Sequence, residues 1–183
     1  MVANVELSLI GERYRDVFGA NITPSFGEYL GMGEGGNASA ALGYRRAGNE
    51  ALFLEAYLEA PVEHVVSETL QRPVARNQIV EIGNFAADQV MAMVELWGAA
   101  ANDLGAQCEV AVATLTAPLR RMFARIGVPI HIMASARPND RVADIAAWGR
   151  YYESDPMVCC GSIIDGQDAI ARFLSRRKRK VAA

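Results

Sequence analysis

The sequence predicts a mixed α/β (α+β) domain in which helices flank a β-sheet, because apolar segments of strand length alternate with helical segments along its second half. Glycines follow two of the helical segments, at Gly105 and Gly127, where helices commonly end. Such alternation predicts a sheet covered by helices, with right-handed strand–helix–strand connections.

Length and composition indicate one globular unit. The 183 residues predict a single domain over residues 1–183, with a basic tail from about residue 175. Apolar residues make up 51% of the chain and charged residues 21%, and the net charge of −3 gives no reason to expect a nucleic-acid partner. No apolar run reaches the roughly 18 residues of a membrane-spanning helix, so we expect no transmembrane segment.

The cysteines predict a reducing compartment. Cys108, Cys159 and Cys160 form an odd set with one adjacent pair, which does not describe a disulfide framework. We interpret them as small buried apolar groups, and His64 and His131 lie too far apart to suggest a metal site with them. The first residues also lack the basic and long apolar parts of a signal peptide. We therefore expect a cytoplasmic protein without a bound metal.

The N-terminal segment predicts a strand at residues 5–10 and a short helix at residues 12–18. Residues 22–37 are rich in glycine and contain Pro24, which predicts a mostly irregular loop. Apolar side chains in so long a loop indicate that it folds over another part of the protein.

A β-hairpin is predicted next. Residues 38–47 and 51–57 read as its strands, and residues 48–50 as its turn. A helix should then run over residues 61–71, because Pro61 has no amide hydrogen to lose in a first helical turn.

The second half contains the alternating elements. We predict strands at residues 78–86, 108–115, 130–133 and 157–164, and helices at residues 88–104, 116–126 and 165–180. Asp88 and Thr116 are the expected N-caps of the first two of these helices.

Four segments carry a family resemblance that spans most of the chain. They are LFLEAYLEAPVE at residues 52–63, IVEIGNFA at residues 79–86, TLTAPLRRMFARIGV at residues 114–128 and WGRYYESDPMVCCG at residues 148–161. These segments resemble the thermostable hemolysin family. The family name records an association with haemolysis and supplies no molecular mechanism.

The order of elements is also similar to that of GNAT-type transferases, particularly the acyl-homoserine-lactone synthase branch. Residues 13–18 match its early R-x-x-V-F pattern imperfectly, residues 43–46 match its G-x-x-R pattern, and Glu81 falls where its central strand carries a glutamate. The resemblance implies a GNAT-like mixed sheet flanked by helices, with acyl transfer from a thioester.

The chain departs from the GNAT pattern at two places. The glycine-rich pyrophosphate loop is missing before Asp88, and Phe123 stands where many GNAT enzymes place a tyrosine acid. That loop supplies amides for the phosphates of coenzyme A, so its absence favours acyl carrier protein as the donor without excluding the coenzyme. We expect acyl-ACP or acyl-CoA as co-substrate and no tightly bound cofactor.

Glu81 is the main catalytic candidate, because it lies between Val80 and Ile82 in an otherwise apolar strand. A carboxylate there is costly unless it is paired or faces a cleft. Burial would raise its pKa and help it accept a proton from an ammonium nucleophile. The alternative is a structural ion pair with Arg45, Arg46 or Arg76.

The acyl donor is expected beside Gly83. In a GNAT-like site, a break in the central strand exposes a backbone amide to the thioester oxygen. Gly83 suits such a break, and Phe85 or Ala86 would then donate the amide hydrogen. The alternative is that Gly83 only allows close packing.

Five further residues are candidates for the acceptor's site. Arg45 and Arg46 point to opposite faces of their strand, so one of them could hold a substrate carboxylate or phosphate, unless the strand end is simply solvated. Glu55 and Tyr57 are predicted substrate-binding residues, although their spacing also suits an ordinary half-buried strand. Asn84 is predicted to act in catalysis or to bond the strand break.

A catalytic acid is not assigned by these patterns. Tyr151 and Tyr152, next to Trp148, could supply the acid that Phe123 cannot, although such a cluster more often packs at a core edge.

The predicted function is therefore N-acyl transfer from a carrier-bound thioester to the amine of a small molecule. One alternative is a membrane-active hemolysin or toxin, for which the sequence offers no long amphipathic hairpin. Another is a non-catalytic GNAT-like binding module. The basic run at residues 176–180 could contact an acidic carrier protein or membrane lipid, or could simply be solvated.

Overall fold

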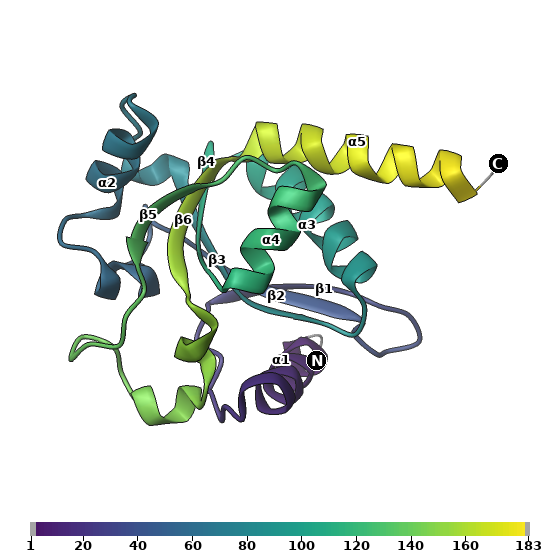
Figure 1. The fold of residues 1–183 in the computed structure, drawn as a ribbon, viewed down its shortest axis with the longest axis horizontal. Helices are drawn as coiled ribbons and strands as arrows, with labels where there is room; N and C mark the ends of the chain where they lie inside the picture. Colours follow the sequence, from purple (N-terminus) through teal and green to yellow (C-terminus); the bar gives the residue numbers. More distant parts are fainter. Residues whose placement is uncertain (1–2, 182–183) are drawn as a thin grey trace.

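The computed structural model describes residues 3–181 as one six-stranded mixed sheet with helices on both faces (Figure 1). The helices and strands are α1 (Ala3–Phe18), β1 (Glu28–Met32), β2 (Ala40–Arg46), α2 (Val62–Leu70), β3 (Ile79–Ala87), α3 (Val90–Gly105), β4 (Val110–Leu115), α4 (Ala117–Ile126), β5 (His131–Ser135), β6 (Met157–Ser162) and α5 (Ile163–Val181). Short 3₁₀ helices are η1 (Phe53–Tyr57), η2 (Arg76–Gln78), η3 (Ile145–Trp148) and η4 (Tyr151–Ser154).

The sheet has the strand order β1-β2-β3-β4-β6-β5. The β3–β4 pair is parallel and is joined through α3, whereas the other neighbouring pairs are antiparallel. Helices α3, α4 and α5 cover one face, and α1, α2 and η1 lie against the other (Figure 1). The predicted mixed sheet flanked by helices is confirmed.

The predicted strand at residues 5–10 is wrong, because these residues form the first half of α1. Leu9, Ile10 and Tyr14 are buried together against β2 and β3, and this spacing places them on one side of a helix. A short run of alternating apolar residues therefore imitated a strand at the start of an amphipathic helix.

The predicted hairpin is also wrong. Residues 51–57 form no strand, and Phe53–Tyr57 form η1 instead, because the amides of Phe53 and Leu54 donate to the buried Glu81 carboxylate and not to a neighbouring strand. Strand β2 pairs with β1, which lies inside the predicted loop at residues 22–37. That loop does fold over the sheet, since the Phe26 ring lies against Gly43 and Gly83.

Helix boundaries in the second half differ slightly from those predicted. Helix α3 begins at Val90 with Gln89 as its N-cap, so Asp88 is not the cap. Helix α5 begins at Ile163, two residues before Asp165, because β6 already ends at Ser162.

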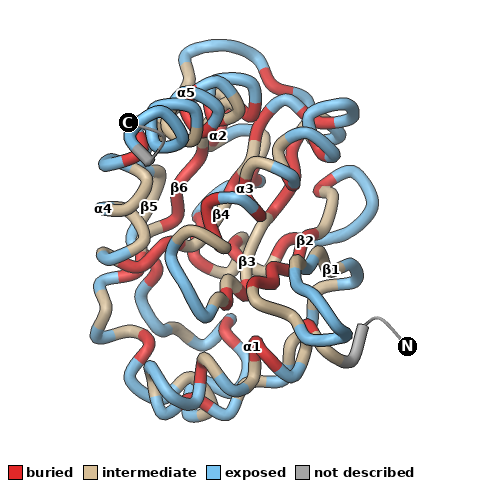
Figure 2. The backbone as a smooth tube through the Cα atoms, turned by 90° about the vertical axis from the view of Figure 1, so that its right-hand side faces the viewer, coloured by how far each residue is buried: buried red, intermediate tan, exposed pale blue. Residues whose placement is uncertain are grey.

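Buried residues follow the central strands, while the outer sides of α1 and the end of α5 are exposed (Figure 2). Val80, Trp97 and Leu104 belong to the cluster beneath α3, and Leu54, Val66 and Val112 belong to the cluster on the opposite face. The three cysteines are buried and free, as the sequence predicted.

We predict that Gly43→Ala destabilises the fold while Gly11→Ala does not. A Cβ at Gly43 would meet Phe26 Cγ at 2.7 Å, which should cost about 1–3 kcal/mol of unfolding free energy. A Cβ at Gly11 meets nothing within 4 Å and should stabilise α1 by about 0.5–1 kcal/mol. Urea unfolding of both variants measures the difference, and equal effects would contradict the packing of Phe26 on Gly43.

Candidate active site where β3 and β4 part

The central strands β3 and β4 pair only over their first three residues and then separate. Their pairing ends at Glu81 and Val112, after which β3 continues beside β2 and β4 continues beside β6. A register shift between Ala41 and Gly43 marks a bulge in the β2–β3 pair, and Asn84 there has a φ of 52°. The parting opens three neighbouring cavities around β3.

The smallest cavity, here called the chamber, has a volume of about 30 Å³ and lies beside Glu81. Polar residues Glu81, Asn84 and Thr114 contribute to its wall, with Gly83 and Ile82. The rest of the wall is aromatic and consists of Tyr14, Phe26, Phe53, Tyr57, Trp148 and Tyr151.

Glu81 is held at the wall of the chamber by backbone amides. Glu81 is only 2% exposed. Its Oε2 accepts a hydrogen bond from Phe53 N at 2.8 Å, and its Oε1 accepts one from Leu54 N at 3.0 Å. Arg45 Nε lies 3.6 Å from Oε2, too far for a hydrogen bond but close enough for attraction. Burial raises the pKa of Glu81 to about 7, although the amides and Arg45 act in the opposite direction.

Glu55 stabilises the segment that holds Glu81. Its carboxylate accepts hydrogen bonds from Leu52 N and Val62 N and from both terminal nitrogens of Arg76. The Arg76 hydrogen bonds lower the pKa of Glu55 to about 2. These contacts account for both carboxylate oxygens, and Glu55 does not line the chamber.

The two arginines of β2 point to opposite faces, as predicted. Arg45 lies behind the chamber, with its guanidinium 4.6 Å from the centre of the Phe26 ring and Nη2 bonded to Ser25 O at 2.9 Å. Arg46 lies on the other face and pairs with Glu28 at 2.6 Å. Neither arginine is among the chamber-lining residues.

Gly83 was predicted either to form the strand break or to allow close packing, and the structure shows elements of both. A Cβ there would lie 2.6 Å from Phe26 Cζ, so the glycine does allow close packing. The bulge itself falls one residue later, at the left-handed Asn84. Asn84 is 7% exposed, and both its Nδ2 and Thr114 Oγ1 are buried.

A larger cleft of about 410 Å³ continues from the chamber and shares Tyr14, Thr114 and Tyr151 with it. Phe85 and Ala86 of β3 lie on its wall. Its remaining lining residues are Arg13, Val17, Phe18, Ala87, Asp88, Gln89, Val90, Met93, Thr116, Pro118, Leu119, Met122 and Ser154.

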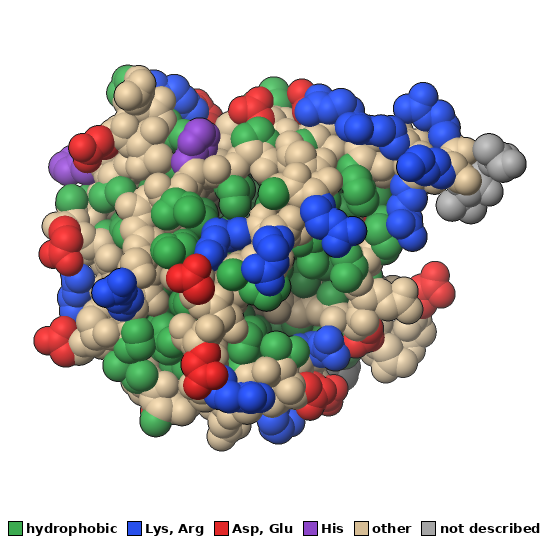
Figure 3. All heavy atoms as spheres, in the orientation of Figure 1, with side chains coloured by type: hydrophobic (Ala, Val, Ile, Leu, Met, Phe, Trp, Pro, Cys, Tyr) green, Lys and Arg blue, Asp and Glu red, His purple; other side chains and the backbone are tan. Residues whose placement is uncertain are grey.

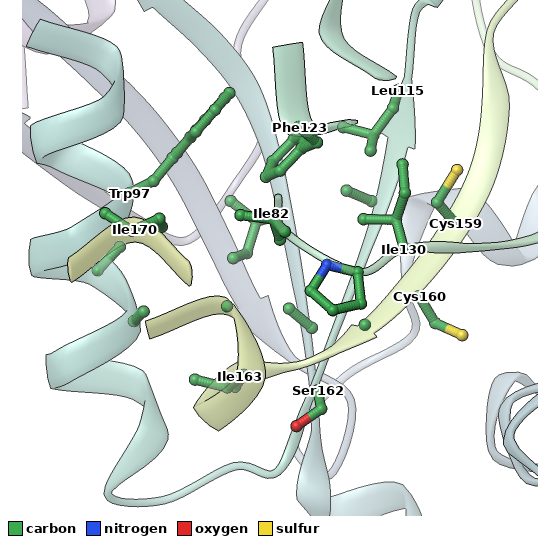
Figure 4. A pocket seen from close by; sticks show the side chains of 18 of the residues that line it. Ile82, Trp97, Leu115, Phe123, Ile130, Cys159, Cys160, Ser162, Ile163 and Ile170 are labelled. Carbon is green, nitrogen blue, oxygen red and sulfur yellow. The ribbon is translucent and has the colours of Figure 1, made fainter. Parts of the chain in front are cut away.

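The third cavity, of about 100 Å³, is apolar and lies between the sheet and helices α3, α4 and α5 (Figure 4). Trp97 of α3 and Phe123 of α4 stack with ring centroids 4.1 Å apart, and both line this cavity together with Ile82 (Figure 4). Phe85 separates this cavity from the larger cleft, because it contributes to the wall of both. Phe123 is therefore a packing residue in this cavity.

Two tyrosine hydroxyls meet next to the chamber. Tyr57 and Tyr152 are hydrogen-bonded at 2.8 Å, and burial raises the pKa of each. Tyr151 is buried between Tyr14 and Trp148, with centroid distances of 6.3 and 5.1 Å. The aromatic cluster thus forms both a core edge and the chamber wall.

Several site residues were missed by sequence reasoning. The amides of Phe53 and Leu54 have no side-chain signal, and Phe26 lies in a loop whose path depends on tertiary packing. Thr114 lies within the predicted strand at residues 108–115, and in the structure it lines both the chamber and the cleft. Thr114 could have been suspected because it is a polar residue in the apolar run of residues 108–115.

Lys and Arg side chains gather on the face that carries α4 and α5 (Figure 3). Arg121 and Arg125 are exposed on α4, and the exposed run at residues 176–180 continues to the end of α5. Within residues 3–181, no helix has both the length and the apolar character needed to cross a bilayer. The same residues contain no group of three side chains arranged to hold a metal ion.

A mixed sheet that opens between its parallel central strands defines the GNAT-like class of fold. The family model for thermostable hemolysin matches residues 2–167, so the chain belongs to the thermostable hemolysin family. No curated protein matches the chain in sequence.

Solved structures with the same fold are distant in sequence. The AHL synthase LasI is 12% identical over 92% of this chain and 87% of its own, with a TM-score of 0.62. The CoA-dependent acyl-homoserine lactone synthase BjaI, solved with SAM and isopentyl-CoA, is 12% identical over 94% and 82%, with a TM-score of 0.62. FeeM, an N-acyl amino acid synthase from uncultured soil microbes, is 10% identical over 91% and 94%, with a TM-score of 0.60. These similarities confirm the GNAT-like fold.

We predict that Glu81→Gln changes how stability depends on pH. Because the folded-state pKa is raised from 4.5 to about 7, the contribution of Glu81 is fully present below pH 4.5 and is lost as pH rises through 7. Wild type should therefore lose stability relative to Glu81→Gln over this range, as measured by urea unfolding. A difference that stays constant with pH would contradict the burial of an ionisable Glu81.

Glu55→Gln should show the opposite sign. The pKa of Glu55 is lowered from 4.5 to about 2, so its contribution is present above pH 4.5 and is lost as pH falls through 2. The advantage of wild type over Glu55→Gln should shrink in acid, in the same unfolding assay. An advantage that grows as pH falls would show that the pair with Arg76 is not the source.

Proposed function

We propose that this protein is an N-acyltransferase that moves an acyl group from a carrier-bound thioester to the amine of a small molecule. The observation that carries the proposal is a buried carboxylate at the point where two parallel strands part. A chamber, a cleft and an apolar cavity meet around that point, and they provide separate places for the acceptor, the thioester and the acyl chain.

Glu81 is proposed as the general base. A general base works best when its pKa lies near the operating pH, and burial raises the pKa of Glu81 to about 7. The amides of Phe53 and Leu54 fix the carboxylate at the chamber wall. Glu81 would therefore take a proton from an ammonium group without leaving its place.

The thioester carbonyl is proposed to lie in the cleft against Phe85 and Ala86. Beyond Glu81, β3 has no β4 partner, so alternate amides on that edge have lost their strand neighbour. One such amide could donate to the thioester oxygen as negative charge develops there, which is the largest single contribution in many acyl transfers. Asn84 and Thr114 add polar side chains beside the same edge.

The acyl chain is proposed to enter the apolar cavity beneath Trp97 and Phe123. Its wall is almost entirely apolar, and Phe85 lies between it and the cleft where the thioester would lie. Burying a chain there gains about 0.8 kcal/mol for each methylene group removed from water.

One structure solved with the same fold supports acyl-CoA as the donor, and the surface charge of this protein is compatible with either donor. BjaI is named a CoA-dependent synthase, which is consistent with acyl-CoA. The exposed cations of α4 and α5 would suit either the phosphates of coenzyme A or an acidic acyl carrier protein. FeeM, named an N-acyl amino acid synthase, supports an amine as acceptor.

We predict that Glu81→Gln strongly reduces turnover while the protein stays folded. Loss of a general base should reduce kcat by about 10²- to 10⁴-fold. Release of free thiol from a panel of acyl-CoA and acyl-ACP donors, with an amine mixture, measures this rate. Glu59→Gln is the matched control, because the Glu59 side chain is 96% exposed and forms a solvent-exposed ion pair with Arg141 Nη2 at 3.3 Å.

Two results would refute the proposed role. Full activity in Glu81→Gln would remove Glu81 from catalysis. Lysis of lipid vesicles by the purified protein without any thioester, together with no thiol release, would instead favour a membrane-active protein.

Ala113→Leu should change the preferred acyl length. Ala113 lines the apolar cavity of about 100 Å³, so a larger side chain there would reduce the volume available to the acyl chain of the donor. We expect kcat/KM for the longest accepted donor to fall at least about tenfold relative to shorter donors. An unchanged chain-length profile in the thiol-release assay would place the acyl chain elsewhere.

A further inference from the structure

We propose that the acceptor is a primary alkylammonium ion whose amine-bearing carbon carries no carboxylate. The inference rests on the proposed function and narrows it, because it names the chemical class that the chamber beside Glu81 selects. Three independent properties of the chamber carry it: its aromatic wall, its charge and its size.

Six aromatic rings form most of the chamber wall. Phe53 and Trp148 lie with centroids 5.6 Å apart, and Trp148 and Tyr14 with centroids 6.2 Å apart, so the rings brace one another. The faces of aromatic rings carry negative potential and attract organic cations, most strongly when water is excluded. Such a wall with one carboxylate is the environment that an ammonium group prefers.

The charge of the chamber excludes a carboxylate next to the amine. Glu81 is the only carboxylate among the chamber-lining residues, and no Lys, Arg or His is found with it. Arg45 already pairs with Glu81 at 3.6 Å and donates to Ser25 O at 2.9 Å, and it is not among the chamber-lining residues. An α-carboxylate bound beside the amine would therefore lie near Glu81 with no cation of its own in the chamber wall, because Arg45 already offsets the charge of Glu81. Two carboxylates placed together in a buried site are costly.

The size of the chamber favours a primary amine. Its volume of about 30 Å³ corresponds to only two or so water-sized groups, since one water needs roughly 10–15 Å³. An –NH₃⁺ head on an unbranched carbon fits such a space. N-methylated amines would have to displace rings that are packed against the core.

Proton transfer follows from this placement. The ammonium gives one proton to the Glu81 carboxylate, and the freed lone pair attacks the thioester carbonyl carbon. The C–S bond then breaks as the C–N bond of the amide is completed, and the nitrogen loses its second proton. One of the two protons goes to the departing thiolate and the other to solvent, so the products are an amide and a free thiol.

Arg13 is the cation that lines the adjoining cleft, and it is not part of the chamber wall. An acceptor with an anionic group several bonds from its amine could place that group in the cleft that Arg13 lines. The proposed selectivity is therefore against amines that carry a carboxylate on the amine-bearing carbon, and not against every anionic acceptor.

The test compares amines with the amino acids from which they differ by one carboxylate. Tyramine is paired with tyrosine, tryptamine with tryptophan and agmatine with arginine, each with the best acyl-CoA or acyl-ACP donor. We expect kcat/KM, from mass-spectrometric measurement of the amide, to be at least about tenfold higher for each amine. N-Methyltyramine should be a poorer acceptor than tyramine. A preference for the amino acids would overturn the inference.

Binding without a donor provides a readout that does not depend on turnover. Titration calorimetry should detect tyramine in preference to tyrosine on wild-type protein. Trp148→Leu should weaken tyramine binding by about 2- to 30-fold through the lost cation–π contact. Phe173→Leu, an aromatic change on α5 outside the chamber, should leave binding unchanged. If Trp148→Leu does not fold, Phe53→Leu tests the same wall.

The two proposals fail in different ways. If no donor and acceptor pair yields an amide, the proposed function fails, and calorimetry alone then judges the inference about the chamber. If amides form but α-amino acids are preferred, acyl transfer stands and the inference is overturned. Tyrosine bound as tightly as tyramine by wild type would overturn it as well.

Discussion

The capture of the Glu81 carboxylate by the amides of Phe53 and Leu54 organises the rest of the structure. A carboxylate buried in the middle of a sheet must have donors, and here the donors come from a chain segment and not from a cation. That segment becomes η1 and leaves the sheet, so the free edge of β2 is available to β1. The fold of the N-terminal half thus follows from the solvation of one side chain.

The parting of β3 from β4 distributes chemistry between the two faces of the sheet. Because side chains alternate along a strand, Ile82 and Glu81 face opposite layers. The layer with α3, α4 and α5 therefore receives apolar residues and a dry cavity, whereas the layer with α1 and η1 receives the carboxylate and the aromatic chamber. Phe85 lies beyond the bulge and borders both the dry cavity and the cleft, so one strand connects the compartments.

Most of the second half of the fold could be predicted from the sequence, because its strands and helices carry their own periodicity and their own glycine stops. The N-terminal half could not, since α1 begins with a run that also alternates like a strand, and residues 51–57 have strand-like composition. Glu81 stood out because it interrupts an apolar strand. The amides that bind Glu81 could not be predicted, because backbone amides are present at nearly every residue and carry no sequence signal. Phe26 could not be predicted as a site residue either, because it reaches the chamber only through tertiary packing.

Burial of Glu81 has two opposing consequences, one for the stability of the fold and one for the pKa of the carboxylate. Burial costs stability once the carboxylate is charged, and the same burial raises its pKa to about 7, where a proton acceptor is most useful. Without the amides and Arg45 the pKa would rise further, and the group would stay protonated at neutral pH. With a closer cation, such as the one that Glu55 has in Arg76, the pKa of Glu81 would fall and the base would be weaker. Arg45 lies 3.6 Å away and no other cation lines the chamber, so the pKa of Glu81 stays between these two extremes. A cationic acceptor that enters the chamber would then neutralise the charge of the ionised Glu81.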